Sequence, residues 1–193
     1  MTTRIAFHLL TFLSATTFLC SCEPRNAPNN LLHDKILSKL NDYSDSLSSK
    51  KLAYTVLNMD SLSGVKWDRI YFFRGNSGYP TDENISSVIG TELKSGDIPD
   101  NATRLIFTSA GSISAVIDFT QDENIWLYGG SPLTEGYNLY GKFDRSKGQK
   151  FAFYPNCNYN KNYSLKLASE FNPQKDLSGE FYTPCYESKL QSK

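Results

Sequence analysis

Histidine is almost missing from this chain, which contains two, His8 and His33. His8 lies inside an apolar N-terminal segment, so His33 is the one imidazole that a folded site could use. A Ser-His-Asp or Cys-His catalytic site would have to be built on His33, which lies near the start of a predicted helix and close to a polar tether. We therefore expect no enzyme, no cofactor and no metal site built on imidazole or thiolate ligands.

An excess of charge of either sign is also missing, because 20 Lys and Arg balance 20 Asp and Glu. The basic residues are scattered singly along the sequence, so we expect no nucleic-acid partner. Paired carboxylates remain a route to glycoside hydrolysis without histidine. The sequence offers Asp68, Asp118 and Glu135 for such a pair, but their spacing does not bring them together.

No apolar run reaches the roughly 20 residues that a membrane-spanning helix needs. The longest is the mostly apolar segment Ile5–Leu19, which follows the single positive charge of Arg4. This arrangement is typical of a secretory signal peptide. A retained anchor helix is disfavoured because Glu23 and the residues after it end the run. A plain signal peptide, cleaved near Ala15 or Ser21, is an alternative that would leave a free thiol at position 22.

The end of this segment resembles a bacterial lipobox. Leu19-Cys20-Ser21-Cys22 has Leu at −3, a small residue at −1 and Cys22 as the first mature residue. The resemblance implies that residues 1–21 are a lipoprotein signal peptide, that Cys22 carries a thioether lipid and that the new amino terminus is acylated. It implies membrane attachment through Cys22, and Glu23 at the second mature position implies the outer membrane of a Gram-negative envelope, facing the periplasm.

Cysteine is scarce as well, with four in the chain. Cys20 leaves with the signal peptide and Cys22 carries the lipid, so Cys157 and Cys185 remain. Because an exported compartment is oxidising, we predict a Cys157–Cys185 disulfide bond. Two unpaired buried thiols are the alternative. Neither cysteine has a CxxC spacing, which argues against redox catalysis.

The chain after the signal peptide has the length of one domain, which we expect to belong to the α+β class. Residues 22–30 form a polar, lipidated tether and residues 31–193 the single domain. An apolar stripe predicts an N-terminal amphipathic helix over 31–49. Thr81 predicts the cap of a second, short helix that ends at Gly90. We expect both helices to pack on an antiparallel β-sheet. The stripe consists of Leu32, Ile36, Leu40, Tyr43 and Leu47.

Alternating apolar and polar residues predict the strands of this sheet. One hairpin is expected from strands 54–58 and 66–73, the second of which has apolar residues on both faces, as in a central strand. A second hairpin, Leu105–Phe119, is expected to bend at Ala110–Ser112 and to have one core face. Further strands are predicted at 124–128, 149–154, 164–169 and 179–183.

The strand Trp67-Asp68-Arg69-Ile70-Tyr71-Phe72-Phe73 resembles one found in a loose group of small bacterial lipoproteins and exported proteins of unknown function. The resemblance covers residues 52–120: a Tyr-containing loop, here with Tyr79, then a short helix ending in Gly and an apolar hairpin. It departs at Asn76-Ser77-Gly78, and it implies no activity. Trp67, Asp68, Tyr71 and Tyr79 are candidate interaction residues. Structural roles compete with this interpretation, since Trp67 suits a core and Asp68 suits a hairpin cap.

These observations favour a lipid-anchored, non-enzymatic envelope protein that binds a protein partner. A toxin-neutralising immunity protein and an accessory factor of an envelope complex both fit. The alternative is a lipoprotein that captures glycan or peptidoglycan fragments on its Tyr-rich loops, and a carboxylate-based hydrolase comes third. Neither the partner's identity nor the oligomeric state follows from the sequence.

Overall fold

The computed structural model describes residues 26–75, 81–120, 123, 126–129, 131–132, 140–156 and 162–177. Helix α1, Asn30–Ser49, begins where the side chain of Asn29 accepts a hydrogen bond from the Leu32 amide at 2.9 Å, a typical N-cap. The four leucine and isoleucine residues of its apolar stripe are buried and Tyr43 is partly buried, on the helix predicted for residues 31–49. In the part of the chain that the structure describes, no helix is both long and apolar enough to cross a membrane.

Five strands form the first sheet, in the order β4-β3-β2-β7-β6 and antiparallel throughout. Ile70 and Phe72 of the central strand β2 face the core shared with α1. Tyr71 and Phe73 face a second apolar cluster on the other side. The prediction that this strand is covered on both faces is confirmed. The strands are β2 (Arg69–Arg74), β3 (Ala102–Ser109), β4 (Ser112–Thr120), β6 (Ser131–Pro132) and β7 (Tyr140–Asp144).

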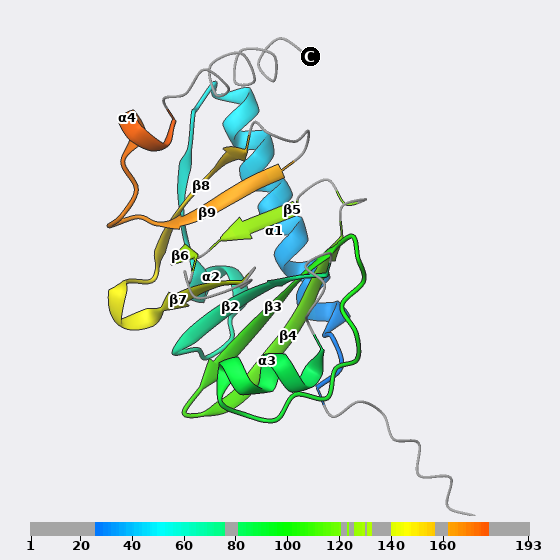
Figure 1. The fold of residues 1–193 in the computed structure, drawn as a ribbon. Helices are drawn as coiled ribbons and strands as arrows, with labels where there is room; N and C mark the ends of the chain where they lie inside the picture. Colours follow the sequence, from blue (N-terminus) through cyan, green and yellow to red (C-terminus); the bar gives the residue numbers. More distant parts are fainter. Residues whose placement is uncertain are drawn as a thin grey trace, which may run out of the picture.

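Helix α3, Asp82–Ile89, covers the second face of this sheet (Figure 1). Thr81 caps it by accepting a hydrogen bond from the Asn84 amide, and Gly90 ends it with a φ of 74°. That left-handed conformation is one that glycine adopts without steric cost. Ile85 and Ile89 are buried against the sheet. The predicted second helix is therefore confirmed, including both of its ends.

The β3–β4 hairpin is confirmed, and its turn has the positive φ values of a type I′ turn at Ala110 (50°) and Gly111 (76°). The prediction that the hairpin has one core face is wrong for β3, because residues on both of its faces are buried. The physical reason is α3 with the loop after it, which supplies the apolar cover for the second face.

The second sheet has the order β1-β8-β9-β5. β1 and β9 both pair antiparallel with β8, while β5 runs parallel to β9. The α+β class is confirmed, with two sheets where one was expected, and predicted strands near 124–128, 149–154 and 164–169 are present. The strand predicted at 179–183 lies outside the described residues. The strands are β1 (Thr55–Asn58), β5 (Trp126–Gly129), β8 (Lys150–Asn156) and β9 (Asn162–Leu167).

The predicted hairpin of strands 54–58 and 66–73 is wrong, because β1 and β2 lie in different sheets. Between them the short helix α2, Met59–Ser63, is capped by Asn58 and ended by Gly64 at a φ of 70°. This helical turn carries the chain from one sheet to the other. The return crossing, from β7 to β8, contains the 3₁₀ helix η2, Arg145–Lys147. Helix α4, Pro173–Asp176, follows β9.

The inner faces of the two sheets share one core with α1 (Figure 1). Trp67, Phe107 and Phe151 are each at most 1% exposed and come from the α2–β2 connection, the first sheet and the second sheet. Phe143 and Phe151 pack edge to face, with ring centroids 4.7 Å apart, a favourable geometry for aromatic pairs. The two sheets therefore pack around common aromatic side chains, and the crossings between them lie at one edge of this core.

Candidate functional site

Two of the chain crossings between the sheets, β1–β2 and β7–β8, lie side by side. Along the first crossing, after β1, the Met59 amide donates to the carbonyl of Gln149 on the second crossing at 3.0 Å. The Arg145 amide donates in turn to the carbonyl of Asp68 at 2.8 Å. Main-chain hydrogen bonds thus join segments far apart in the sequence and place their charged side chains together. We call this region the charged junction: Asp60, Trp67, Asp68, Arg69, Asp144, Arg145 and Gln149.

Arg145 is held by contacts from several directions. Its Nη2 lies 2.7 Å from Asp60 Oδ2 and its Nη1 donates to the Trp67 carbonyl at 3.1 Å. Its guanidinium carbon lies 5.5 Å from the centroid of the Trp67 ring, within cation–π range. Trp67 Nε1 donates to Asp60 Oδ1 at 2.8 Å. With its amide oxygen facing Arg145, Gln149 also accepts from Nε and Nη2 at 3.1 Å. These contacts fix the guanidinium in one place.

A repeated tripeptide builds the other half of the junction. The sequence aromatic-Asp-Arg occurs at Trp67-Asp68-Arg69 and again at Phe143-Asp144-Arg145. Antiparallel pairing of β2 with β7 places Arg69 opposite Asp144, with Arg69 Nε 3.3 Å from Asp144 Oδ1. The dipeptides Asp68-Arg69 and Asp144-Arg145 therefore lie next to each other and run in opposite directions. Trp67 and Asp68 of this site were predicted from the sequence as interaction residues, whereas Arg69, Asp144 and Arg145 were not. The recurrence of the tripeptide was the signal that could have found them.

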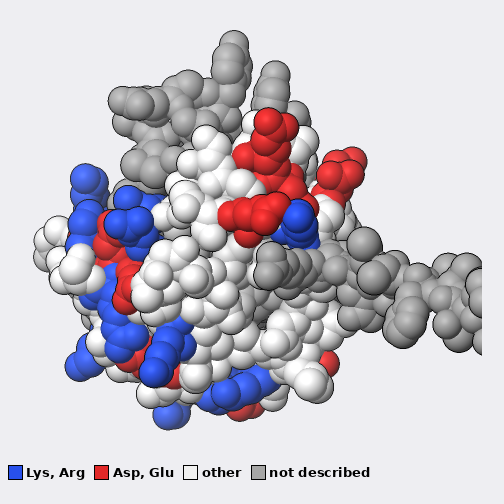
Figure 2. Space-filling model, turned by 90° about the horizontal axis from the view of Figure 1, so that it is seen from below, with Lys and Arg blue, Asp and Glu red and all other residues white. Residues whose placement is uncertain are grey.

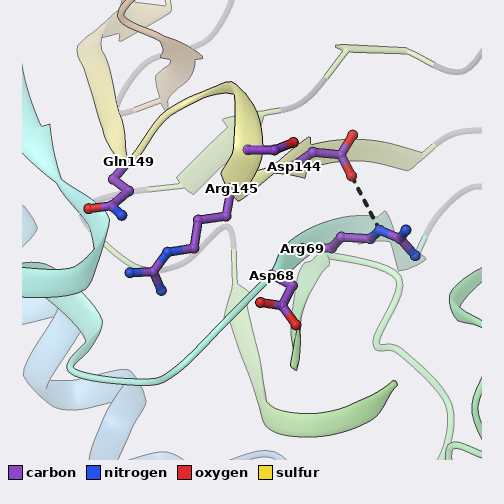
Figure 3. A pocket seen from close by; sticks show the side chains of 6 residues that line it. Asp68, Arg69, Asp144, Arg145 and Gln149 are labelled. Atoms are coloured by element: carbon purple, nitrogen blue, oxygen red, sulfur yellow. Dashed lines mark ion pairs between the residues drawn. The ribbon is translucent and has the colours of Figure 1, made fainter. Parts of the chain in front are cut away.

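The junction surrounds a hollow of about 430 Å³, and Figure 3 shows the five labelled side chains around it. Carboxylates and guanidinium groups of opposite sign line it together with Ser146. The Asp68 carboxylate accepts a hydrogen bond from the Ala110 amide at 2.6 Å, so it caps the β3–β4 turn, one of the structural roles foreseen for it. Asp68 thereby connects the hollow to the tip of the hairpin.

A second hollow, of about 500 Å³, shares Arg145, Ser146 and Gln149 with the first. Lys147 and Lys150 also line it, and among the described residues no carboxylate does. In Figure 2, Lys and Arg gather toward the left, with some Asp and Glu between them, on the side where Figure 1 shows the β7–β8 connection. The basic residues of the second hollow, Arg145, Lys147 and Lys150, all come from one short stretch of the chain.

The interaction residues predicted from the sequence differ in how far they are buried. Trp67 and Tyr71 are buried, with 1% and 3% of their surface exposed, whereas Asp68 is exposed at the first hollow. Arg69 is hydrogen-bonded to Tyr71, which raises the pKa of that guanidinium. Tyr79 lies outside the described residues. So do three cysteines with predicted roles, Cys22, Cys157 and Cys185.

Asp68 and Asp118, two of the carboxylates considered for hydrolysis, are not brought together. Asp118 is held by Arg104, whose Nε and Nη2 donate to its two oxygens at 2.8 and 2.7 Å. Asp118 lies opposite Arg104 of β3. The Asp68 amide donates to the carbonyl of Thr108, which lies four residues further along the same strand. Four residues along a strand correspond to about 13 Å. The third candidate, Glu135, lies outside the described residues.

His33 lies away from the junction, at the start of α1. Its Nδ1 contacts Asp34 at 2.9 Å, and its Nε2 lies 2.8 Å from Glu123 Oε1 without the alignment of a hydrogen bond. Burial raises the pKa of Glu123, while the nearby His33 opposes that rise. In the described ranges, no group of three or more His, Cys, Asp or Glu side chains could hold a metal ion.

The lining of both hollows offers charged groups, hydroxyls and amides, with no histidine or cysteine among the described side chains. Such groups can bind a charged surface through ion pairs and hydrogen bonds. No family model matches this chain, and no curated protein or solved structure is significantly similar to it. Its function must therefore be inferred from its own residues.

Proposed function

We propose that this protein is a lipid-anchored, non-enzymatic binding protein of a bacterial envelope, and that its partner is another protein. The observation that carries the proposal is the charged junction, where oppositely charged side chains are fixed around an open hollow. Complementary charge on a partner steers the encounter and gives specificity.

The junction is organised before any partner arrives. Arg145 is fixed by Asp60, Trp67 and Gln149, and Arg69 is paired with Asp144. Side chains that are already ordered lose less conformational entropy on binding, so more of the interaction energy appears as affinity. A fixed set of charges around a hollow therefore supports recognition of a specific surface.

The position of the tether supports a partner that approaches from solution. The Asn26 amide donates to the Lys94 carbonyl, and the Asn29 amide donates to Val116 on the free side of edge strand β4. The junction lies at the ends of β2 and β7, which are separated from edge strand β4 by β3 (Figure 1). A chain attached to a membrane through Cys22 would present its junction away from the attachment.

Immunity and accessory roles both fit this arrangement. The alternative, capture of glycan or peptidoglycan fragments, depended on Tyr-rich loops that lie largely outside the described side chains. Among the residues that the structure places, no aromatic one lines either hollow, whereas an aromatic side chain would offer a face for a sugar ring. The described surface thus supports a protein partner more than a glycan.

Site-specific cross-linking in the host tests the proposal. A photo-cross-linking amino acid replaces Ser146, which is exposed at both hollows, in the full-length lipidated protein. The control places it at Glu83, which is exposed on α3. We expect one protein partner to be captured from position 146 and not from position 83. Equal capture from both positions, or none from either, would contradict the proposal.

A further inference from the structure

We infer that the second hollow, of about 500 Å³, is the groove in which an acidic segment of the protein partner binds. This inference rests on the proposed function and adds the chemistry of the partner. The groove lies between the β7–β8 connection and the segment after β9. Its floor and walls therefore come from main chain that the fold already holds.

The charge of the groove is of one sign. Arg145, Lys147 and Lys150 line it, and in the described part of the chain no carboxylate does. Lys147 and Lys150 are exposed and, among the residues that the structure describes, form no ion pair. Two ammonium groups without a counter-charge, next to a fixed guanidinium, favour a ligand with carboxylates.

The groove is held in shape by hydrogen bonds between its walls. The Ala168 amide donates to the Lys150 carbonyl at 2.9 Å, and the Ser169 hydroxyl lies 3.5 Å from the Lys147 carbonyl. Asn58 also lines the groove, and its side-chain oxygen accepts hydrogen bonds from the Asp60 and Ser61 amides of α2. Fixed walls and free cationic side chains together suit an extended acidic segment.

Two other anionic ligands fit the groove less well. An anionic membrane surface is disfavoured because the tether begins at the β4 edge of the first sheet, and β3 and β2 lie between that edge and β7. A phosphorylated glycan is disfavoured because no aromatic ring lines the groove among the described residues. Carboxylates on a flexible peptide can instead reach each lysine separately, since ion pairs of exposed lysines impose little geometry.

The test measures binding of a fluorescent, alternating Glu-Ser peptide to the mature lipidated protein in detergent, with a Gln-Ser peptide as the uncharged probe. The variant is Lys147→Glu combined with Lys150→Glu. Its matched control, Lys50→Glu combined with Lys94→Glu, changes the net charge equally at exposed lysines elsewhere. We expect the first variant to lose at least about tenfold in affinity, because like charges would then face each other. The control should bind as the wild type does, and added salt should weaken binding.

Three results would overturn the inference. One is equal binding of the Glu-Ser and Gln-Ser peptides, and another is equal binding by the wild type and the Lys147→Glu, Lys150→Glu variant. The third is binding of a phosphorylated glycan in place of the Glu-Ser peptide. If a protein is still captured from position 146 in any of these cases, the proposed function stands and only the acidic groove fails. Absence of capture would remove the proposed function itself.

Discussion

Arg145 lies over the ring of Trp67, 5.5 Å from its centroid, although 78 residues separate them in the sequence. The same guanidinium binds Asp60, which in turn accepts the indole N–H of Trp67. One cation thus connects α2, the start of β2 and the end of β7 at the point where the chain passes between the two sheets. Its surroundings make the junction both a structural connection and a fixed charged surface.

Replacing Arg145 should loosen this connection. Arg145→Met removes the cation from Asp60 and from the Trp67 ring, and because the side chain is 34% exposed we expect a modest loss. The free energy of unfolding should fall by about 1–2 kcal/mol. Urea unfolding followed by far-UV circular dichroism measures it. Lys147→Met, on the same crossing, should change it by less than about 0.5 kcal/mol. Equal effects would show that the contacts of Arg145 contribute nothing.

Arg104 and Asp118 form a pair whose separation should be costly. Arg104 is 1% exposed and also donates to Ser95 and to the Gly96 carbonyl. Arg104→Leu leaves the Asp118 carboxylate without its partner, and we expect a loss of about 3 kcal/mol in the free energy of unfolding. Adding Asp118→Leu should recover part of that loss, because the unpaired charge is then gone. A double variant less stable than Arg104→Leu alone would contradict this account.

Gly75 allows a close main-chain approach at the end of β2. A Cβ atom there would lie 1.8 Å from the carbonyl oxygen of Pro99. Gly75→Ala should therefore displace backbone and cost about 3 kcal/mol of stability. At Gly111 nothing lies within 4 Å of such a Cβ atom, and the φ of 76° alone predicts a cost of about 1 kcal/mol for Gly111→Ala. Thermal unfolding compares the two, and equal costs would show that the backbone near Gly75 yields freely.

Asp176 should make stability depend on pH in acid. Burial alone would raise its pKa, but hydrogen bonds from Lys166 Nζ, 2.8 Å from both oxygens, and from the Asn172 amide hold the pKa below its usual value. A lowered carboxyl pKa adds stability that is present above the unfolded-state pKa and is lost as pH falls through the folded-state pKa. Asp176→Asn should remove this dependence below about pH 4. Urea midpoints measured across that range test it, and identical profiles would refute it.

The proposed lipid attachment depends on one residue, Cys22. Cys22→Ser should abolish palmitate labelling of the protein and release it from the membrane fraction, because a single serine hydroxyl does not replace the lipidated thiol of a lipobox. Metabolic labelling followed by fractionation measures both effects. Cys20→Ser, two residues away, should leave labelling intact. Continued labelling of the Cys22→Ser protein would exclude this attachment site.

Local structure was largely readable from the sequence. The stripe of α1, the Thr81 cap and Gly90 end of α3, and the alternation of the β3–β4 hairpin all depend on residues close in the chain. The prediction of a hairpin between β1 and β2 was wrong for a related reason. The five residues of α2 have the sequence features of a turn. Short helical turns and tight turns share the same caps and glycines.

The sequence by itself determined helices α1 and α3, most strands, the α+β class and the two-sided burial of β2, because periodicity and capping act over a few residues. Only the tertiary structure decided that there are two sheets, that Arg69 faces Asp144 and that Arg145 lies over Trp67. Those contacts join strands through pairing registers set by packing of the whole core, which no local pattern specifies. For the same reason, Arg69 and the pair Asp144 and Arg145, which are far apart in the sequence, became one charged surface only once the chain had folded.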